Sequence, residues 1–172
     1  MGEIKSTIDL VLEKTRDLTL SREEKMSLAM EELDKKLHGI LNRYLDNLLP
    51  LSRLKEEVEI IDSKEHGLSY KLIKKHLLAH FDLDSENNSV LSALSEIAGF
   101  DILPLTVLRK EYQAEKEETK RAFNDSALLS LKERGVSGSA VVPNLSHDPD
   151  WDQFLKSLRK RYRERLKMIE NG

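Results

Sequence analysis

The 172-residue chain has no cysteine, and aromatic residues make up only 5% of it. The missing cysteine excludes disulfides, thiolate metal sites and cysteine nucleophiles. Glycine and proline, the residues that most often interrupt helices, number only seven and four. Charged residues reach 34% and hydrophobic residues 39%, and the latter is too high for a disordered chain. This composition predicts a helical and partly elongated protein.

Long hydrophobic runs are also missing from the sequence. No run approaches the roughly eighteen apolar residues that a membrane-spanning helix needs. Charges interrupt residues 1–18, where a signal peptide would have its apolar region. We therefore expect a cytoplasmic protein that has no membrane among its partners.

The apolar residues that are present recur at alternating spacings of three and four, which is the period of a helix with one apolar face. Helix boundaries are marked by a capping box at Ser21 and Glu24, by Pro50, by Gly135, and by an N-cap at Asp148. These signals predict helices over residues 4–18, 21–48, 51–61, 68–81, a segment containing 90–98, 103–134 and 149–169.

These elements predict an all-α fold of antiparallel helices, with a long protruding C-terminal helical hairpin made by residues 103–134 and 149–169. Residues 113–121 have almost no apolar face, as in helices that bridge through solvent or are held by charge pairs, and this part of the hairpin is expected to project from the main core. The chain is expected to divide into an N-terminal helical region, 1–102, and the hairpin, 103–172, with a single domain as the alternative.

The uncharged stretch GVSGSAVVPNL, residues 135–145, connects the two helices of the hairpin. Within it, Ser139, Ala140, Val141 and Val142 are candidates for a short β-segment near 139–142 that mediates an interaction. Because a single strand leaves its backbone groups unpaired, one hypothesis is that this segment pairs with another strand, such as its copy in a second subunit. The alternative is an extended link packed by its valines.

The last 22 residues carry seven basic and three acidic side chains. One reading is a surface that contacts phosphates of a nucleic acid or acidic lipids. The other is a helix whose cations are salt-bridged to acidic residues of the 103–134 helix, and this second reading is favoured over nucleic acid. The candidate anion contacts are Lys156, Arg159, Lys160, Arg161, Arg163, Arg165 and Lys167.

Three shorter patterns suggest small-ligand sites but lack the residues that would complete them. His76 and His80 lie four apart, as a metal pair would, without an evident third ligand. The 82–93 segment departs from a calcium loop at its glycine and its final glutamate positions. The 135–139 glycine-serine turn has no phosphate-binding lysine. We predict no metal, no cofactor and no catalytic residue.

Two segments, GEIKSTIDLVLEKTRDLTLSREEK in residues 2–25 and ERGVSGSAVVPNL in residues 133–145, resemble a bacterial family of small helical proteins without an assigned function. The resemblance implies a bacterial cytoplasmic protein and supplies no catalytic residues.

The heptad-like spacing predicts a non-enzymatic interaction or assembly protein that forms a homodimer through coiled-coil-like faces. One alternative is a nucleic-acid-binding protein that uses the basic C-terminal helix. Another is a small-ligand-binding protein or an enzyme without a recognisable motif.

Overall fold

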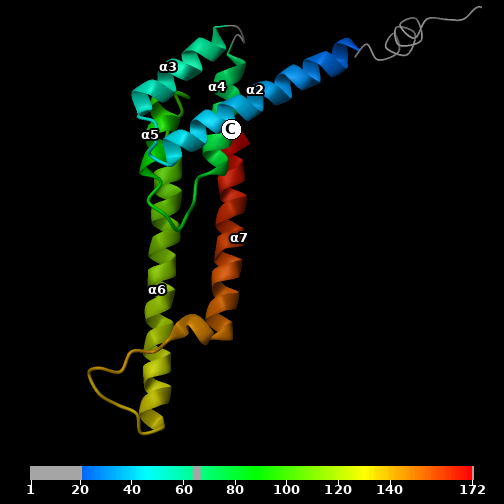
Figure 1. The fold of residues 1–172 in the computed structure, drawn as a ribbon. Coiled ribbons are helices and arrows are strands. Elements are labelled where there is room, and N and C mark those ends of the chain that lie inside the picture. Colours follow the sequence, from blue (N-terminus) through cyan, green and yellow to red (C-terminus); the bar gives the residue numbers. More distant parts are fainter. Residues whose placement is uncertain (1–20, 64–66, 172) are drawn as a thin grey trace, which may run out of the picture. The chain divides into compact units, whose positions relative to one another are not determined.

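In a computed structural model, which describes residues 21–63 and 67–171, the chain is all-α, as predicted (Figure 1). The described residues form six α-helices and one 3-10 turn, and they include no strand. The predicted helix over residues 4–18 lies outside the described part. The elements are α2 (Arg22–Leu45), α3 (Leu51–Asp62), α4 (Leu68–Ala79), α5 (Asn88–Glu96), α6 (Leu103–Glu133), η1 (Leu145–His147) and α7 (Pro149–Asn171).

The chain divides into two compact units, Met1–Leu72 and Ile73–Gly172. The boundary between the two units falls inside α4. The physical reason lies in the loop between α4 and α5, which bonds to α6. The Gln113 side-chain amide donates to the carbonyl oxygen of Leu83 at 2.7 Å, and Asp84 accepts from the Tyr112 hydroxyl. The α5 region therefore belongs with the long helices.

In the first unit, α2 begins at the predicted capping box. The Ser21 hydroxyl oxygen accepts from the Glu24 backbone N–H at 3.1 Å, and the Ser21 N–H donates to the Glu24 carboxylate at 2.7 Å. The helix ends at Leu45, slightly before the predicted end, and Pro50 precedes α3 as expected. The two helices then pack against each other.

The apolar stripe of α2 is covered along only part of its length. Leu33, Leu37 and Ile40 are buried, whereas Met26 and Met30, which continue the same stripe toward the start of the helix, are exposed. The periodicity of the sequence is the same in both halves, so it does not reveal which half is covered.

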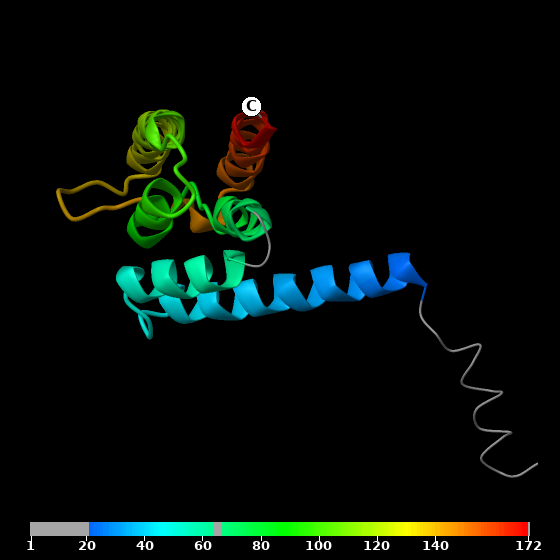
Figure 2. The ribbon, with the colours of Figure 1, turned by 90° about the horizontal axis from the view of Figure 1, so that it is seen from above.

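In the second unit, α6 and α7 lie side by side and antiparallel (Figures 1 and 2). The direction follows from the paired rings: Tyr112 contacts Tyr162, whereas Phe123, later in α6, contacts Trp151, earlier in α7. The apolar faces meet as the helical period requires. The side chains they bury are Leu105, Leu108 and Tyr112 from α6 and Trp151, Leu158, Tyr162 and Leu166 from α7.

The ends of these two helices follow the local sequence signals. The Asp148 carboxylate accepts from the backbone N–H groups of Asp150 at 2.9 Å and Trp151 at 3.1 Å, which is the predicted N-cap of α7. At the end of α6, Gly135 has a φ of 80°, a left-handed conformation that glycine adopts without a steric penalty. The Val136 N–H bonds back to the Leu131 carbonyl oxygen at 2.9 Å, which closes the helix.

The short β-segment considered for residues 139–142 is not formed. Ser139 and Ala140 lie in a turn, and the Val141 N–H donates to the Gly138 carbonyl oxygen at 3.2 Å. In the described chain no other strand is present to provide a ladder, so the backbone of this segment bonds locally.

The packing of α7 against α6 predicts a sharp contrast between two substitutions on one helix. Leu158 is 1% exposed and Met168 is 76% exposed. We expect Leu158→Ala to lower the free energy of unfolding by about 3 kcal/mol, because it leaves a cavity in a packed contact. Met168→Ala, the matched control, should change it by less than about 0.5 kcal/mol. Urea denaturation followed by circular dichroism measures both, and equal losses would show that this face of α7 is not packed.

Candidate interaction site

A single carboxylate joins three elements. It lies in the loop that connects α4 to α5, and it contacts both α6 and α7. Asp84 accepts from the Tyr112 hydroxyl at 3.0 Å, from the Lys116 ammonium at 2.5 Å and from Arg159 Nε at 3.1 Å. Partial burial by itself would raise the pKa of Asp84, but the hydrogen bonds from Lys116 and Tyr112 and the charge of Arg159 lower it below its ordinary value. The loop is thereby tied to both long helices.

A second group of contacts joins α6 and α7 directly, beside those of Asp84. Glu115 pairs with Arg161 and accepts from the Tyr162 hydroxyl at 3.1 Å. Glu111 pairs with Arg165 at 2.6 Å. Burial, followed by the hydrogen bond to Glu115, raises the pKa of the Tyr162 hydroxyl, so this tyrosine stays neutral and donates to the carboxylate.

The two tyrosine rings lie between these charged pairs. The centroids of Tyr112 and Tyr162 are 5.4 Å apart, with an angle of 74° between the ring planes. This edge-to-face contact is a favoured arrangement of aromatic rings. The Arg165 guanidinium lies 4.9 Å from the Tyr162 centroid, which adds a cation–π contact. The polar and apolar contacts between α6 and α7 thus form one continuous layer.

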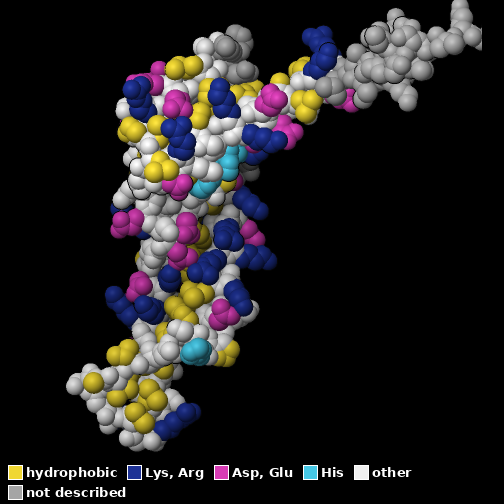
Figure 3. All heavy atoms as spheres, in the orientation of Figure 1, with side chains coloured by type: hydrophobic (Ala, Val, Ile, Leu, Met, Phe, Trp, Pro, Cys, Tyr) yellow, Lys and Arg dark blue, Asp and Glu magenta, His cyan; other side chains and the backbone are white. Residues whose placement is uncertain are grey.

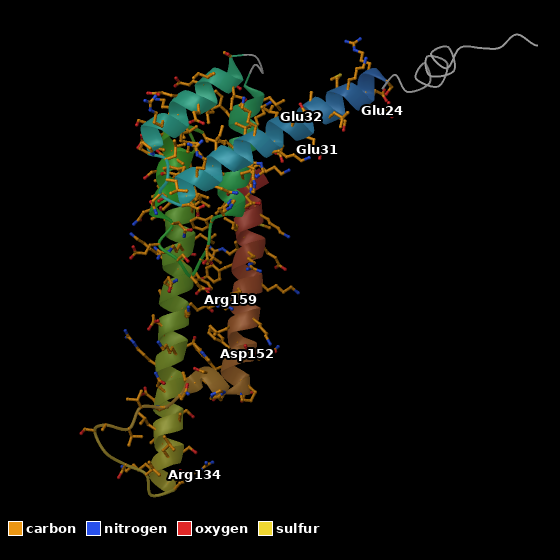
Figure 4. All side chains as sticks on the ribbon, viewed as in Figure 1. Glu24, Glu31, Glu32, Arg134, Asp152 and Arg159 are labelled. Atoms are coloured by element: carbon orange, nitrogen blue, oxygen red, sulfur yellow. The ribbon has the colours of Figure 1, made fainter. Side chains whose placement is uncertain are left out.

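This layer engages three of the seven cations that the sequence marked as candidate anion contacts, and a fourth forms an ion pair within α7. Arg159 pairs with Asp84, Arg161 with Glu115 and Arg165 with Glu111, whereas Lys156 pairs with Asp152 at 2.7 Å on α7 itself. Figure 4 labels Arg159 and Asp152 on α7. Within the stretch 113–121 of α6, Glu115 pairs with Arg161 of α7 and Lys116 pairs with Asp84 of the loop before α5.

The remaining three predicted cations lie elsewhere on α7. Lys160 and Arg163 are exposed and have no ion-pair partner among the described residues. Arg163 and Lys167 line a pocket of about 260 Å³ together with Arg159. Its other charged lining residues are the acidic Asp82, Asp84 and Glu170. This pocket therefore presents both signs of charge and does not select for an anion.

The start of α7 is anchored by an aromatic cluster. Trp151 and Phe154 stack with centroids 5.5 Å apart, and both rings lie beside Phe123 of α6, at 5.5 and 6.4 Å. Because α7 begins at Pro149, opposite Phe123, residues 124–133 of α6 extend beyond the first turn of α7. Figures 1 and 4 show this difference, with Arg134 labelled well past Asp152.

Large apolar side chains are exposed on this end of α6 and on the connector that follows. We call them the distal apolar surface, and Figure 3 shows hydrophobic side chains gathered over this part of the molecule. Beside it, an open pocket of about 460 Å³ lies between α6 and the connector and is lined by Phe123, Leu131 and Pro143 among others. The members of the distal apolar surface are Leu128, 37% exposed, Leu129, 65%, Val136, 48%, and Val142, 82%.

The sequence located this site in part. Of the predicted interaction segment, Ser139, Ala140 and Val142 are exposed and Val141 is half-buried. Leu128 and Leu129 were not predicted as part of an interaction segment, which was placed in the connector alone. The seven-residue spacing of Ala122 and Leu129 was the available signal, since it marks a second helix face.

The small-ligand patterns do not converge on a site. The described residues contain no group of three His, Cys, Asp or Glu side chains placed to hold a metal ion. His80 Nδ1 donates to the His76 carbonyl oxygen at 2.8 Å. Asp82 accepts from the Asp84 N–H and from the Ser85 hydroxyl, so it shapes the loop. None of the described helices has the length and apolar composition needed to cross a membrane.

Comparison of the chain with protein-family models, with curated proteins and with solved structures finds no match. The resemblance of residues 2–25 and 133–145 to a bacterial family therefore stays a prediction.

The bonds of Asp84 predict a pH-dependent stability. We expect Asp84→Asn to lower the free energy of unfolding by about 1–2 kcal/mol near neutral pH, since hydrogen bonds from charged donors lose their ionised acceptor. Because the pKa of Asp84 is lowered in the folded chain, its ionised form stabilises the fold above the pKa of the unfolded chain. That stabilisation is lost as the pH falls through the folded pKa.

The measurement is urea denaturation of wild type and Asp84→Asn from neutral pH to below about pH 4, the ordinary range for an aspartate. The difference between them should shrink toward acid. Glu96→Gln, which neutralises an exposed carboxylate on α5, is the control and should differ little from wild type throughout. A difference for Asp84→Asn that stays constant across this range would contradict the assignment.

Proposed function

We propose that this chain is a non-enzymatic helical interaction protein that self-associates, and that the distal apolar surface is its contact. The observation that carries the proposal is the exposure of Leu128, Leu129, Val136 and Val142 at one end of α6. Large apolar side chains exposed together on one part of a molecule, as Figure 3 shows, are typical of surfaces that bind another protein. Their burial in a complex would gain about 25 cal/mol for each Å² removed from water.

The charge layer between α6 and α7 supports the same function. Asp84, Glu111 and Glu115 already receive partners from within the chain. An outside ligand that bound Arg159, Arg161 or Arg165 would have to compete with these carboxylates. The distal apolar surface has no such competitor, because its side chains are in contact with solvent and lose nothing when a partner covers them.

Sedimentation of the purified full chain tests the proposal. We expect the weight-average mass to rise toward twice the chain mass of 19.8 kDa over about a hundredfold range of concentration, as mass action requires. A mass that stays monomeric at the highest concentration would overturn self-association. Native mass spectrometry of the same sample would show any bound nucleotide or other small molecule, which would favour the ligand-binding alternative.

The nucleic-acid alternative has its own test, and the ion pairs of α7 show which cations to change in it. Lys160 and Arg163 are the exposed cations of α7 to substitute, because their replacement leaves the ion pairs of Arg159 and Arg161 intact. Phosphate binding would produce an affinity for DNA or RNA that falls steeply with salt and is abolished by Lys160→Glu with Arg163→Glu. We expect weak binding that this pair of substitutions leaves unchanged.

A further inference from the structure

We infer that two copies of this chain associate by a two-fold, antiparallel contact of the free end of α6, with Leu129 of each copy beside the symmetry axis. The inference rests on the proposed self-association and names its geometry. A two-fold contact requires one surface that is complementary to itself. The end of α6 meets this requirement in its shape, in its apolar residues and in its charges.

The outward face of α6 is defined by the residues on its other side. Phe123, Ala127 and Leu131 line the pocket beside the connector, so they mark the inward face. At about 100° per residue, Leu129 points roughly 160–200° away from Ala127 and Leu131. Ala122, Asp125 and Lys132 share the side of Leu129, because they lie seven, four and three residues from it.

On the side of Leu129 that carries Leu128, this outward face bears Asp125 and Lys132, and the exposed Glu133 lies on the other side of Leu129. The side chains of Asp125 and Lys132 are exposed, and among the described residues no hydrogen bond or ion pair engages either side chain. Most cations of the contact between α6 and α7, by contrast, have a carboxylate opposite them. An acid and a base without partners, placed on either side of an exposed leucine, suit a contact made from outside the chain.

A two-fold axis beside Leu129 brings these charges together. In an antiparallel pair, the level of Asp125 on one helix meets residues 132–133 of the other, to within about 1.5 Å along the axis. Asp125, Leu128 and Lys132 all lie to the same side of Leu129 on the helix surface, and the axis keeps that side together in both copies. Asp125 of each copy then faces Lys132 of the other, and the two Leu128 side chains meet beside them.

Charge also decides between the two possible directions. A parallel pair in register would place Asp125 against Asp125 and Lys132 against Lys132, which is repulsive. The antiparallel pair instead forms two ion pairs around the Leu129 contact. In this antiparallel pair, Ala122 of one copy lies level with the residues that follow α6 in the other copy, where Val136 is exposed. The contact covers only about four helical turns, so we expect a dimer of modest affinity that forms with concentration.

The absence of cysteine in the chain makes cross-linking a direct test of this geometry. We expect Leu129→Cys to give a covalent dimer in high yield with a short bismaleimide, because the two thiols lie beside the axis. Lys120→Cys is the matched control. It is an exposed position of α6 about 180° around the helix from Leu129, and its copies would lie on the outer sides of the dimer. Equal yields from both variants would overturn the proposed axis.

A charge-exchange cycle tests the pairing itself. Asp125→Lys and Lys132→Asp should each weaken dimerisation about tenfold, because each creates two like-charge contacts. The double variant, which exchanges the two charges, should restore the wild-type dissociation constant. All positions are exposed, so circular dichroism should show an unchanged helix content. A double variant as weak as the single ones would contradict the antiparallel register.

A further variant separates this inference from the proposed function. Met26 and Met30 form the other exposed apolar stripe, on α2. If Met26→Lys with Met30→Lys abolishes a wild-type dimer that Leu129→Lys leaves intact, the chain self-associates but not through α6. If Leu129→Lys abolishes the dimer and the α2 variant does not, the α6 contact stands. A wild-type chain that is monomeric throughout would overturn both proposals.

Discussion

The contact between α6 and α7 depends on two buried tyrosines whose hydroxyl groups need acceptors. Tyr112 and Tyr162 fill the space between the helices, and a buried hydroxyl without a partner would cost free energy. Asp84 and Glu115 supply the acceptors. Each carboxylate brings charge into a partly dry contact, so it requires cations in turn, and Lys116, Arg159 and Arg161 provide them. The same residues therefore provide both the apolar packing and the charge pairing of this contact.

The need of these carboxylates for cations explains several of the basic residues of α7. Seven cations on one helix suggest, by themselves, a binding surface for a polyanion. In the folded chain, however, Arg159, Arg161 and Arg165 form ion pairs with carboxylates of α6 and of the loop before α5. Their energetic contribution is modest where they are exposed. They also favour this register, since a shift of α7 by one turn would leave one of the two carboxylates, Glu111 or Glu115, opposite an uncharged residue. The helix is better described as one half of a charge-matched pair than as an open binding surface.

The register set by this layer also determines where the interaction site lies. Trp151 and Phe154 stack against Phe123, which places the first turn of α7 ten residues before the end of α6. An α7 that began earlier in the chain would cover the side of α6 that the connector now borders. With the observed lengths, Leu128 and Leu129 remain exposed next to Asp125 and Lys132. The packing at the aromatic cluster thus sets how much of α6 extends beyond the first turn of α7.

The sequence by itself determined the class of the fold and most of the helix ends, because these depend on residues within about four positions of each other. The Ser21 and Glu24 capping box, the Asp148 cap and the turn at Gly135 are contacts of this kind. The tertiary structure decided the rest. Asp84 meets residues 28 and 75 positions away, and no local pattern encodes such a pairing. The unit boundary within α4, the turn in place of a strand at 139–142, and the exposure of Leu129 likewise follow from what packs against what. Periodicity shows that a helix has a face, but only the packed chain shows whether that face is covered.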